Sequence, residues 1–392
     1  MSLKSLTPLE IKKTLPVYIA DLFFSLHYAA ILYVNSSLLE QYFSVRITSI
    51  LFILGAIGNI LLFYKAPHLL KRFGNRALFF VLVLLDAFAT CGLAVSSSPH
   101  LIALFFVIFE SVGIMIYFCL DIFLEDASLD ANTGTIRGID LTVANTAVAV
   151  GPLLIAYFAI SGNFSRLYGF SALLLLPLLY QAFFSFKLFR DGEAESYEGE
   201  TASASELWWK NKDIRRITLA RFILEFFYAF MVIYVPVYLH ESVGFDWVQI
   251  GTMFAIMLVP FILLQFPAGE AADVWLGEKE LLITGFFFTG ASVLFMPFIG
   301  KSFLLWTIAL FVSRIGAALA EVMSDTYFFK SVNKRDTGLI TIFRVSRPVG
   351  IVAGALWGIL VLFYTSYAGM FFTLGVISLV GILVSLNIRD TL

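Results

Sequence analysis

Twelve long apolar segments dominate this sequence and limit the folds that it can adopt. Crossing the hydrocarbon core of a bilayer takes about 20 mostly apolar residues in helical form. Windows of that size fall at 14–38, 47–64, 77–96, 101–124, 138–161, 166–187, 215–239, 248–270, 280–299, 302–329, 337–363 and 367–387. Because continuous apolar runs satisfy their backbone groups in lipid as helices, the sequence predicts an all-α membrane protein with twelve transmembrane helices.

Composition supports a membrane environment. Hydrophobic residues make up 60% of the chain and charged residues only 14%, against about 25% in soluble domains. The net charge of −2 indicates no basic surface for nucleic acid, so the predicted partners are a small-molecule solute and the lipid bilayer. Cys91 and Cys119 both fall inside apolar segments, which excludes a disulfide framework.

A polar stretch divides the apolar segments into two groups of six. It begins with acidic residues among Gly, Ser and Ala, which is typical of a flexible linker. It continues with Trp208, Trp209 and a basic run, which favour a helix at the membrane interface. The predicted parts are an N-terminus at 1–13, a bundle at 14–187, a linker at 188–214, a bundle at 215–387 and a tail at 388–392.

The two groups of six are related by an internal duplication. The sequence Phe227-Tyr228-Ala229 corresponds to His27-Tyr28-Ala29 at an offset of 200 residues. At an offset of 204, the first-half residues Glu110, Tyr117 and Asp121 correspond to Arg314, Glu321 and Asp325. Duplication of a helix bundle is typical of secondary transporters, and it predicts two pseudo-symmetric six-helix bundles.

Positive charges predict the orientation of the chain in the membrane. With both termini in the cytoplasm, 19 of the 26 lysines and arginines fall in inside segments, and only Arg46, Arg166 and Lys301 fall in outside loops. Lysine and arginine collect on the cytoplasmic side of membrane proteins. The sequence therefore predicts an integral protein of the cell membrane, plasma or inner, with both termini cytoplasmic.

The loop between the eighth and ninth segments carries a motif. It begins with Gly269, places Asp273 four residues later, and ends with Gly277 and the basic Lys279. This loop resembles the signature loop of the major facilitator superfamily. The resemblance implies two six-helix bundles around a central cavity and substrate movement by alternating access. In that family the first, fourth, seventh and tenth helices line the cavity.

The corresponding loop of the first half, 67–76, departs from the family pattern. It keeps Gly74 between two arginines but has Lys71 at the position of the family's aspartate. In the family, that aspartate helps to latch neighbouring helices on the cytoplasmic side. The resemblance therefore implies an intact latch at Asp273 and an altered one at Lys71.

Ionisable residues inside the apolar segments are concentrated in a few of them. Such residues are costly in hydrocarbon, so they face a bundle interior or a water-filled cavity. Most of them fall in the first, fourth, seventh and tenth segments, and the fifth and eleventh add Asp140, Arg344 and Arg347. Asp86 in the third segment is an exception that the sequence does not explain.

Many of these charges are spaced to share a helix face. Positions seven or eleven residues apart lie within about 20° of each other on a helix with 3.6 residues per turn. This spacing holds for Glu110, Tyr117 and Asp121 and again for Arg314, Glu321 and Asp325. Matched positions are acidic in the first half and basic in the second, so we expect some of these pairs to meet in one conformation and separate in another. The matched pairs are Asp21 with Arg221, Glu110 with Arg314, and Asp140 with Arg344.

The candidate site residues fall into two groups. Contact with substrate or protons is predicted for His27, Tyr28, Glu110, Tyr117, Glu225, Tyr228 and Arg314. A gating or structural role is predicted for Asp21, Asp121, Asp140, Arg221, Gly269, Asp273, Glu321, Asp325, Arg344 and Arg347. Helix packing is the competing interpretation for the tyrosines, and a neutral, hydrogen-bonded side chain is the competing interpretation for His27.

Motifs of enzymes are missing from the sequence. Its histidines are isolated, and it has neither a Gly-x-Ser-x-Gly nucleophile motif nor a paired-cysteine metal motif. We therefore predict a secondary transporter of a small solute, monomeric, not an enzyme, with no cofactor and no metal. The mixed charges favour a polar, charged or zwitterionic solute and are compatible with proton coupling. The alternatives are a non-transporting membrane receptor or assembly factor with a transporter fold, and a membrane-embedded enzyme.

Overall fold

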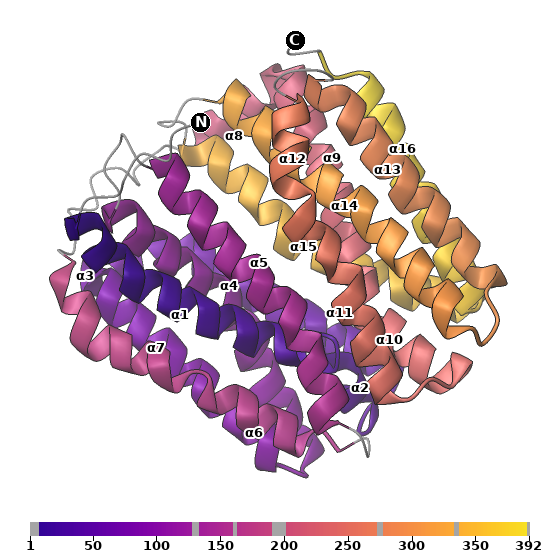
Figure 1. The fold of residues 1–392 in the computed structure, drawn as a ribbon, viewed down its shortest axis with the longest axis horizontal. Coiled ribbons are helices and arrows are strands. Elements are labelled where there is room, and N and C mark those ends of the chain that lie inside the picture. Colours follow the sequence, from indigo (N-terminus) through magenta and orange to yellow (C-terminus); the bar gives the residue numbers. More distant parts are fainter. Residues whose placement is uncertain are drawn as a thin grey trace. The chain divides into compact units, whose positions relative to one another are not determined.

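A computed structural model describes residues 8–127, 133–159, 163–189, 201–272, 277–332 and 337–389. Helices make up nearly all of these residues, and no strand occurs among them (Figure 1). The chain divides into two compact units. The first unit comprises Met1–Phe43 and Leu54–Ala194, and the second comprises Ser44–Ile53 and Glu195–Leu392. The segment Ser44–Ile53, which was predicted as part of the first bundle, thus groups with the second unit.

The first unit is built on a long N-terminal helix. Its elements are α1 (Pro8–Leu32), α2 (Asn35–Glu40), α3 (Val45–Val95, shared with the second unit), α4 (Pro99–Ala127), α5 (Thr133–Phe158), α6 (Ser165–Leu173), α7 (Leu176–Tyr180), a π-helical segment η1 (Gln181–Ser185) and a 3₁₀ turn η2 (Phe186–Leu188). Helix α1 packs along α5 and also against α4 and α6 (Figure 1). It therefore touches most of the unit's other helices.

Helix α3 contains two of the predicted membrane segments. It is 51 residues long and changes direction at Gly74, where φ is 75° and ψ is 159°. Only glycine adopts that backbone region at low cost. The segment 67–76, predicted as a loop, is helical up to this glycine, because polar side chains at a helix end do not by themselves break the helix. Arg76, just beyond the turn, donates from Nε to the carbonyl oxygen of Ala182 in η1 at 2.7 Å.

The second unit repeats this arrangement. Its elements are α8 (Thr201–Lys210), α9 (Lys212–Ile233), α10 (Val235–Val237), the π-helical η3 (Tyr238–Val243), α11 (Trp247–Leu263), α12 (Gln265–Ala271), α13 (Gly277–Phe295), the 3₁₀ turn η5 (Met296–Phe298), α14 (Phe303–Ser331), α15 (Thr337–Tyr364) and α16 (Tyr367–Leu386). Helix α9 packs along α15 and against α14, as α1 packs along α5 and against α4. The duplication in sequence is thus a duplication of packing.

The short helix α8 precedes the second bundle. It ends at Lys210, and the side chain of Asn211 caps α9 by accepting hydrogen bonds from the backbone of Asp213 and Ile214. Trp208 Nε1 donates to Thr218 Oγ1 at 3.2 Å, which ties α8 to α9. Residues 190–200 of the predicted linker lie outside the described residues.

The helices are long and apolar enough for a bilayer. Ten of them in the described part of the chain have the length and composition to cross a membrane. Because α3 holds two segments and the 17-residue α11 continues into α12 after Leu264, this count is consistent with the twelve predicted segments. The all-α membrane fold predicted from the sequence is confirmed.

Glycines allow the backbones of neighbouring helices to touch. A Cβ atom added at Gly285 of α13 would lie 2.7 Å from the carbonyl oxygen of Gly316 in α14. One added at Gly151 of α5 would lie 2.5 Å from the Cβ of Ala29 in α1. Small residues are the usual means of close helix packing in membranes, where lipid removes the hydrophobic driving force between helices.

Candidate functional site

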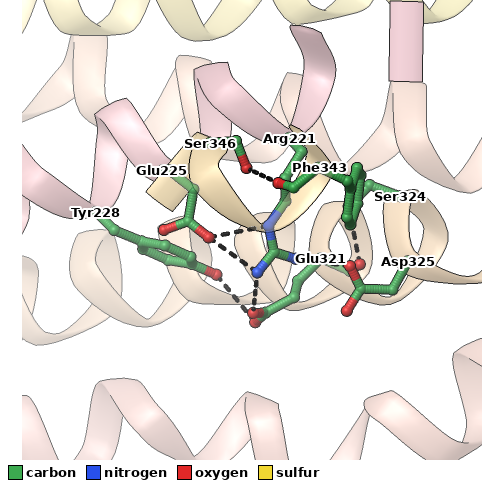
Figure 2. Close-up of polar contacts among 8 residues, drawn as sticks. All are labelled: Arg221, Glu225, Tyr228, Glu321, Ser324, Asp325, Phe343 and Ser346. Carbon is green, nitrogen blue, oxygen red and sulfur yellow. Dashed lines mark hydrogen bonds and ion pairs between the residues drawn. The ribbon is translucent and has the colours of Figure 1, made fainter. Parts of the chain in front are cut away.

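Arg221 of α9 binds three carboxylates of the second unit. Its Nη2 lies 2.8 Å from Oε1 of Glu225 and 3.2 Å from Oε1 of Glu321, and its Nη1 donates to Oδ1 of Asp325 at 3.0 Å (Figure 2). Glu225 follows one turn later on α9, whereas Glu321 and Asp325 lie on successive turns of α14. The guanidinium therefore joins α9 to α14 through ion pairs in which Glu225 is buried and Glu321 and Asp325 are partly exposed.

Aromatic groups complete this ion-pair cluster. The hydroxyl of Tyr228, two turns after Arg221 on α9, donates to Oε2 of Glu321 at 3.2 Å (Figure 2). The guanidinium carbon of Arg221 lies 5.9 Å from the ring centre of Phe343 in α15. Arg344, the next residue of α15, interacts electrostatically with Asp325. Three helices thus contribute to one cluster, and Arg221 lies at ion-pair distance from each of its three carboxylates.

Arg314 lies two turns before Glu321 on α14 and has a different environment. Its side chain is buried, with 1% exposed. Its guanidinium carbon lies 5.1 Å from the ring centre of Phe227 and 5.6 Å from that of Tyr228. Among the described residues, no acceptor forms a hydrogen bond with Nε or Nη1. Arg314 is therefore a buried cation that contacts ring faces and leaves several donors unsatisfied.

The first unit places its own polar cluster at the matched positions. Oδ1 of Asp21, at the position of Arg221, accepts a hydrogen bond from Ser25 at 3.0 Å, and the hydroxyl of Ser25 lies 3.0 Å from that of Tyr117. The carboxyl of Asp21 also interacts electrostatically with those of Asp140 and Asp121. Helices α1, α4 and α5 therefore meet at this cluster, as α9, α14 and α15 do in the second unit.

The contact between Asp21 and Asp140 has a chemical consequence. Ionised carboxylates only accept hydrogen bonds, whereas a protonated carboxyl can also donate one. Two ionised carboxylates at this place would repel each other, and a hydrogen bond between them would form only if one of them held a proton. The second unit has no pair of carboxyls at the matched positions, because Arg221 and Arg344 occupy them.

His27 takes part in a second buried network of the first unit. Its Nε2 lies 3.4 Å from Oδ2 of Asp86 in α3, and its Nδ1 lies 2.8 Å from Oγ of Ser171 in α6. Thr90 donates to the other oxygen of Asp86 at 3.2 Å. This network explains Asp86, which the sequence left unexplained, and no spacing pattern could have paired residues on separate helices. Both ring nitrogens of His27 thus face partners within the unit.

The remaining candidates from mid-membrane positions lie in the packing of the first unit. Glu110 is 8% exposed, and its Cβ and Cγ cover Gly55 of α3. Tyr28 is also buried, with its ring 6.3 Å from that of Phe109 and 6.1 Å from that of Tyr117. These contacts bring Tyr28 and Tyr117 together and place Glu110 where α4 approaches α3.

The predicted latch loop is described only in part. Gly269 is half-buried in α12, and Asp273 lies outside the described residues. Gly277, at the start of α13, has a φ of 72°, close to the 75° of its counterpart Gly74. Sequence reasoning missed the neighbouring contact in which Lys330 of α14 lies 2.5 Å from the buried Glu278.

The two remaining candidates differ in exposure. Arg344 is exposed and Arg347 is half-buried, both on α15. The described residues contain no group of three His, Cys, Asp or Glu side chains that could hold a metal ion.

A duplicated bundle of apolar helices with ionised groups in its interior is the architecture of a membrane transport protein. A sequence profile of the Major Facilitator Superfamily matches residues 14–259 and 217–391, and the chain belongs to this family. The family predicted from the signature loop and the span pattern is thus confirmed.

Solved structures show the same fold. A mutant of the nucleoside transporter NupG superposes with a TM-score of 0.78 at 12% identity, covering 96% of this chain and 99% of that one. An auto-inhibited peptide transporter of the POT family superposes with a TM-score of 0.74 at 12% identity, covering 97% and 98%. A comparison with curated protein sequences gave no significant match.

Proposed function

We propose that this protein is a secondary active transporter that moves a small polar or charged solute by alternating access. The observation that carries the proposal is the ion-pair cluster of Arg221, Glu225, Glu321 and Asp325 inside apolar helices. Ionised groups at membrane depth are costly and mark pathways for substrates and ions. Membership of a transporter family supports the same reading.

Proton coupling is part of the proposal. The carboxyls of Asp21 and Asp140 interact electrostatically, and a proton bound by one of them would relieve the repulsion between two negative charges. A change in the distance between these side chains would release that proton. Binding and release of the proton would then favour one conformation over the other and link an ion gradient to solute movement.

The residues proposed to contact solute or protons lie on α1 and α4 of the first unit and on α9 and α14 of the second. They are the residues predicted from the sequence: His27, Tyr28, Glu110, Tyr117, Glu225, Tyr228 and Arg314. The gating group is Asp21, Asp121, Asp140, Arg221, Gly269, Asp273, Glu321, Asp325, Arg344 and Arg347. We further propose that both termini lie in the cytoplasm, because the positive charges collect on that side. We also propose that the protein is a monomer in the plasma or inner membrane.

Uptake by proteoliposomes tests this function. Purified protein is reconstituted, and radiolabelled nucleosides and short peptides are tested first, because the structures with the same fold belong to transporters of these solutes. Accumulation that depends on an imposed pH gradient and is lost in Arg221→Gln would support the proposal. Saturable solute binding without any movement across the bilayer, with or without a gradient, would instead favour the non-transporting receptor.

A further inference from the structure

We propose that Arg314 is the binding group for an oxyanion of the transported solute, a carboxylate or a phosphate. The inference rests on the proposed transport function and adds to it the chemical class of the solute. It starts from a contrast within the second unit. Arg221 and Lys330 each have a carboxylate at ion-pair distance, whereas the contacts of Arg314 are the rings of Phe227 and Tyr228.

The unsatisfied donors of Arg314 are well defined. Nε carries one hydrogen and Nη1 carries two. Among the described residues none of the three has an acceptor, although the side chain is only 1% exposed. Buried donors without acceptors are rare and destabilising. A ligand that supplies acceptors would remove this cost.

The rings determine how a ligand can approach. Phe227 and Tyr228 interact with the guanidinium through their π-electron faces, at 5.1 and 5.6 Å from its carbon. The N–H bonds lie in the guanidinium plane, so contact with ring faces does not use them. The rings therefore hold the cation in place and leave its donors available to a ligand.

Charge selects an oxyanion over a neutral acceptor. The hydroxyl of Tyr228 donates to Glu321, and Arg221 holds Glu225, Glu321 and Asp325. The nearby carboxylates are thus already engaged, and the guanidinium of Arg314 is left for an anion from outside the protein. Hydrogen bonds between a guanidinium and a carboxylate or phosphate are about twice as strong as bonds between neutral groups.

A thermal-shift assay on the purified full chain tests the inference. The ligands are matched pairs that differ in the anionic group: benzoate with benzamide, a dipeptide with its C-terminal amide, and a nucleoside 5′-monophosphate with the nucleoside. Because a ligand that binds the folded state raises its melting temperature, we expect the anionic member of a pair to raise it further than the neutral member. The pairs separate a carboxylate site from a phosphate site, and this comparison needs no variant.

Variants then assign the effect to Arg314. Arg314→Lys keeps the charge but loses the planar fork of donors, and we expect about tenfold weaker binding or more. Arg314→Gln should abolish the preference for the anionic member. The matched control is Arg166→Lys, because Arg166 is exposed in the other unit. Each variant is first checked for a single cooperative melting transition without ligand.

Three results would overturn the inference. They are equal stabilisation by both members of every pair, an unchanged affinity for the anion in Arg314→Gln, and the lack of any stabilisation of the unmodified protein by the anions. None of these bears on movement across the bilayer. Failure of the proposed transport function would give a different result, namely anion binding that depends on Arg314 without any uptake by proteoliposomes.

Discussion

His27 and Asp86 form a contact of 3.4 Å between Nε2 and Oδ2 in which neither side chain is exposed. The distance fits an electrostatic contact better than a well-formed hydrogen bond. The contact joins α1 to α3, and Ser171 extends it to α6. In the second half of the duplication, Phe227 stands at the position of His27. The polar network is therefore a property of the first unit.

Removal of Asp86 should destabilise the first unit. In Asp86→Leu, Nε2 of His27 stays buried without its partner, which costs about 1–3 kcal/mol. His27→Phe introduces the residue of the matched position and should offset part of that loss in the double variant. Thermal unfolding in detergent measures the double-mutant cycle. A coupling free energy near zero would mean that the two side chains are buried independently.

Neutralising Arg221 should have a larger effect. Arg221→Gln leaves Glu225, Glu321 and Asp325 without their shared cation. Breaking the buried pair with Glu225 costs about 3–5 kcal/mol, whereas the partly exposed carboxylates of Glu321 and Asp325 add less. Removing one carboxylate as well, in Arg221→Gln with Glu321→Gln, should restore part of the stability. Chemical denaturation followed by tryptophan fluorescence measures both. A double variant as unstable as the sum of the single ones would exclude this pairing.

Proton coupling should depend on Asp140. Asp140→Asn replaces the carboxyl that interacts with Asp21 by a neutral amide of similar size, which carries no titratable proton. We therefore expect the variant to fold and to exchange labelled for unlabelled solute across the bilayer, while uptake driven by a pH gradient is lost. Asp246→Asn, at the exposed N-cap of α11, serves as the control. Gradient-driven uptake that survives in Asp140→Asn would place the coupling proton elsewhere.

The turn at Gly74 should tolerate no side chain. Its φ of 75° and ψ of 159° lie in a region that is nearly restricted to glycine, so Gly74→Ala should cost about 1–3 kcal/mol. Gly277→Ala should behave similarly, because φ there is 72°. Gly300→Ala is the matched control, since a Cβ there meets nothing within 4 Å. The melting temperatures of the three variants test this prediction, and equal values would argue against backbone strain at both turns.

Close packing of α13 on α14 gives a further prediction. A Cβ atom at Gly285 would lie 2.7 Å from the carbonyl oxygen of Gly316, and one at Gly316 would lie 2.6 Å from the backbone nitrogen of Thr289. Backbone atoms cannot move aside without separating the helices, so either alanine variant should lose about 1–3 kcal/mol. Gly169→Ala, in open space, should change stability little. A melting curve unchanged by Gly316→Ala would show that the two helices can separate at little cost.

Much of this architecture can be predicted without coordinates. Apolar run length predicts the membrane helices, and the repeat at an offset of about 200 residues predicts two similar bundles. Helical spacing also places Glu321 and Asp325 on one face of a helix. The extent of α3 could not be predicted, because whether a polar segment ends a helix depends on a single backbone angle at Gly74.

The choice of ionic partners was decided by tertiary structure alone. The sequence determined which charged side chains each helix presents and which of them share a face. It could not determine that His27 meets Asp86, or that Arg221 holds three carboxylates while Arg314 holds none among the residues that the structure describes. Periodicity fixes the face of one helix, whereas a pair between helices depends on the rotation and depth of both. Those are set by the packing of whole helices, including the glycines that let them touch.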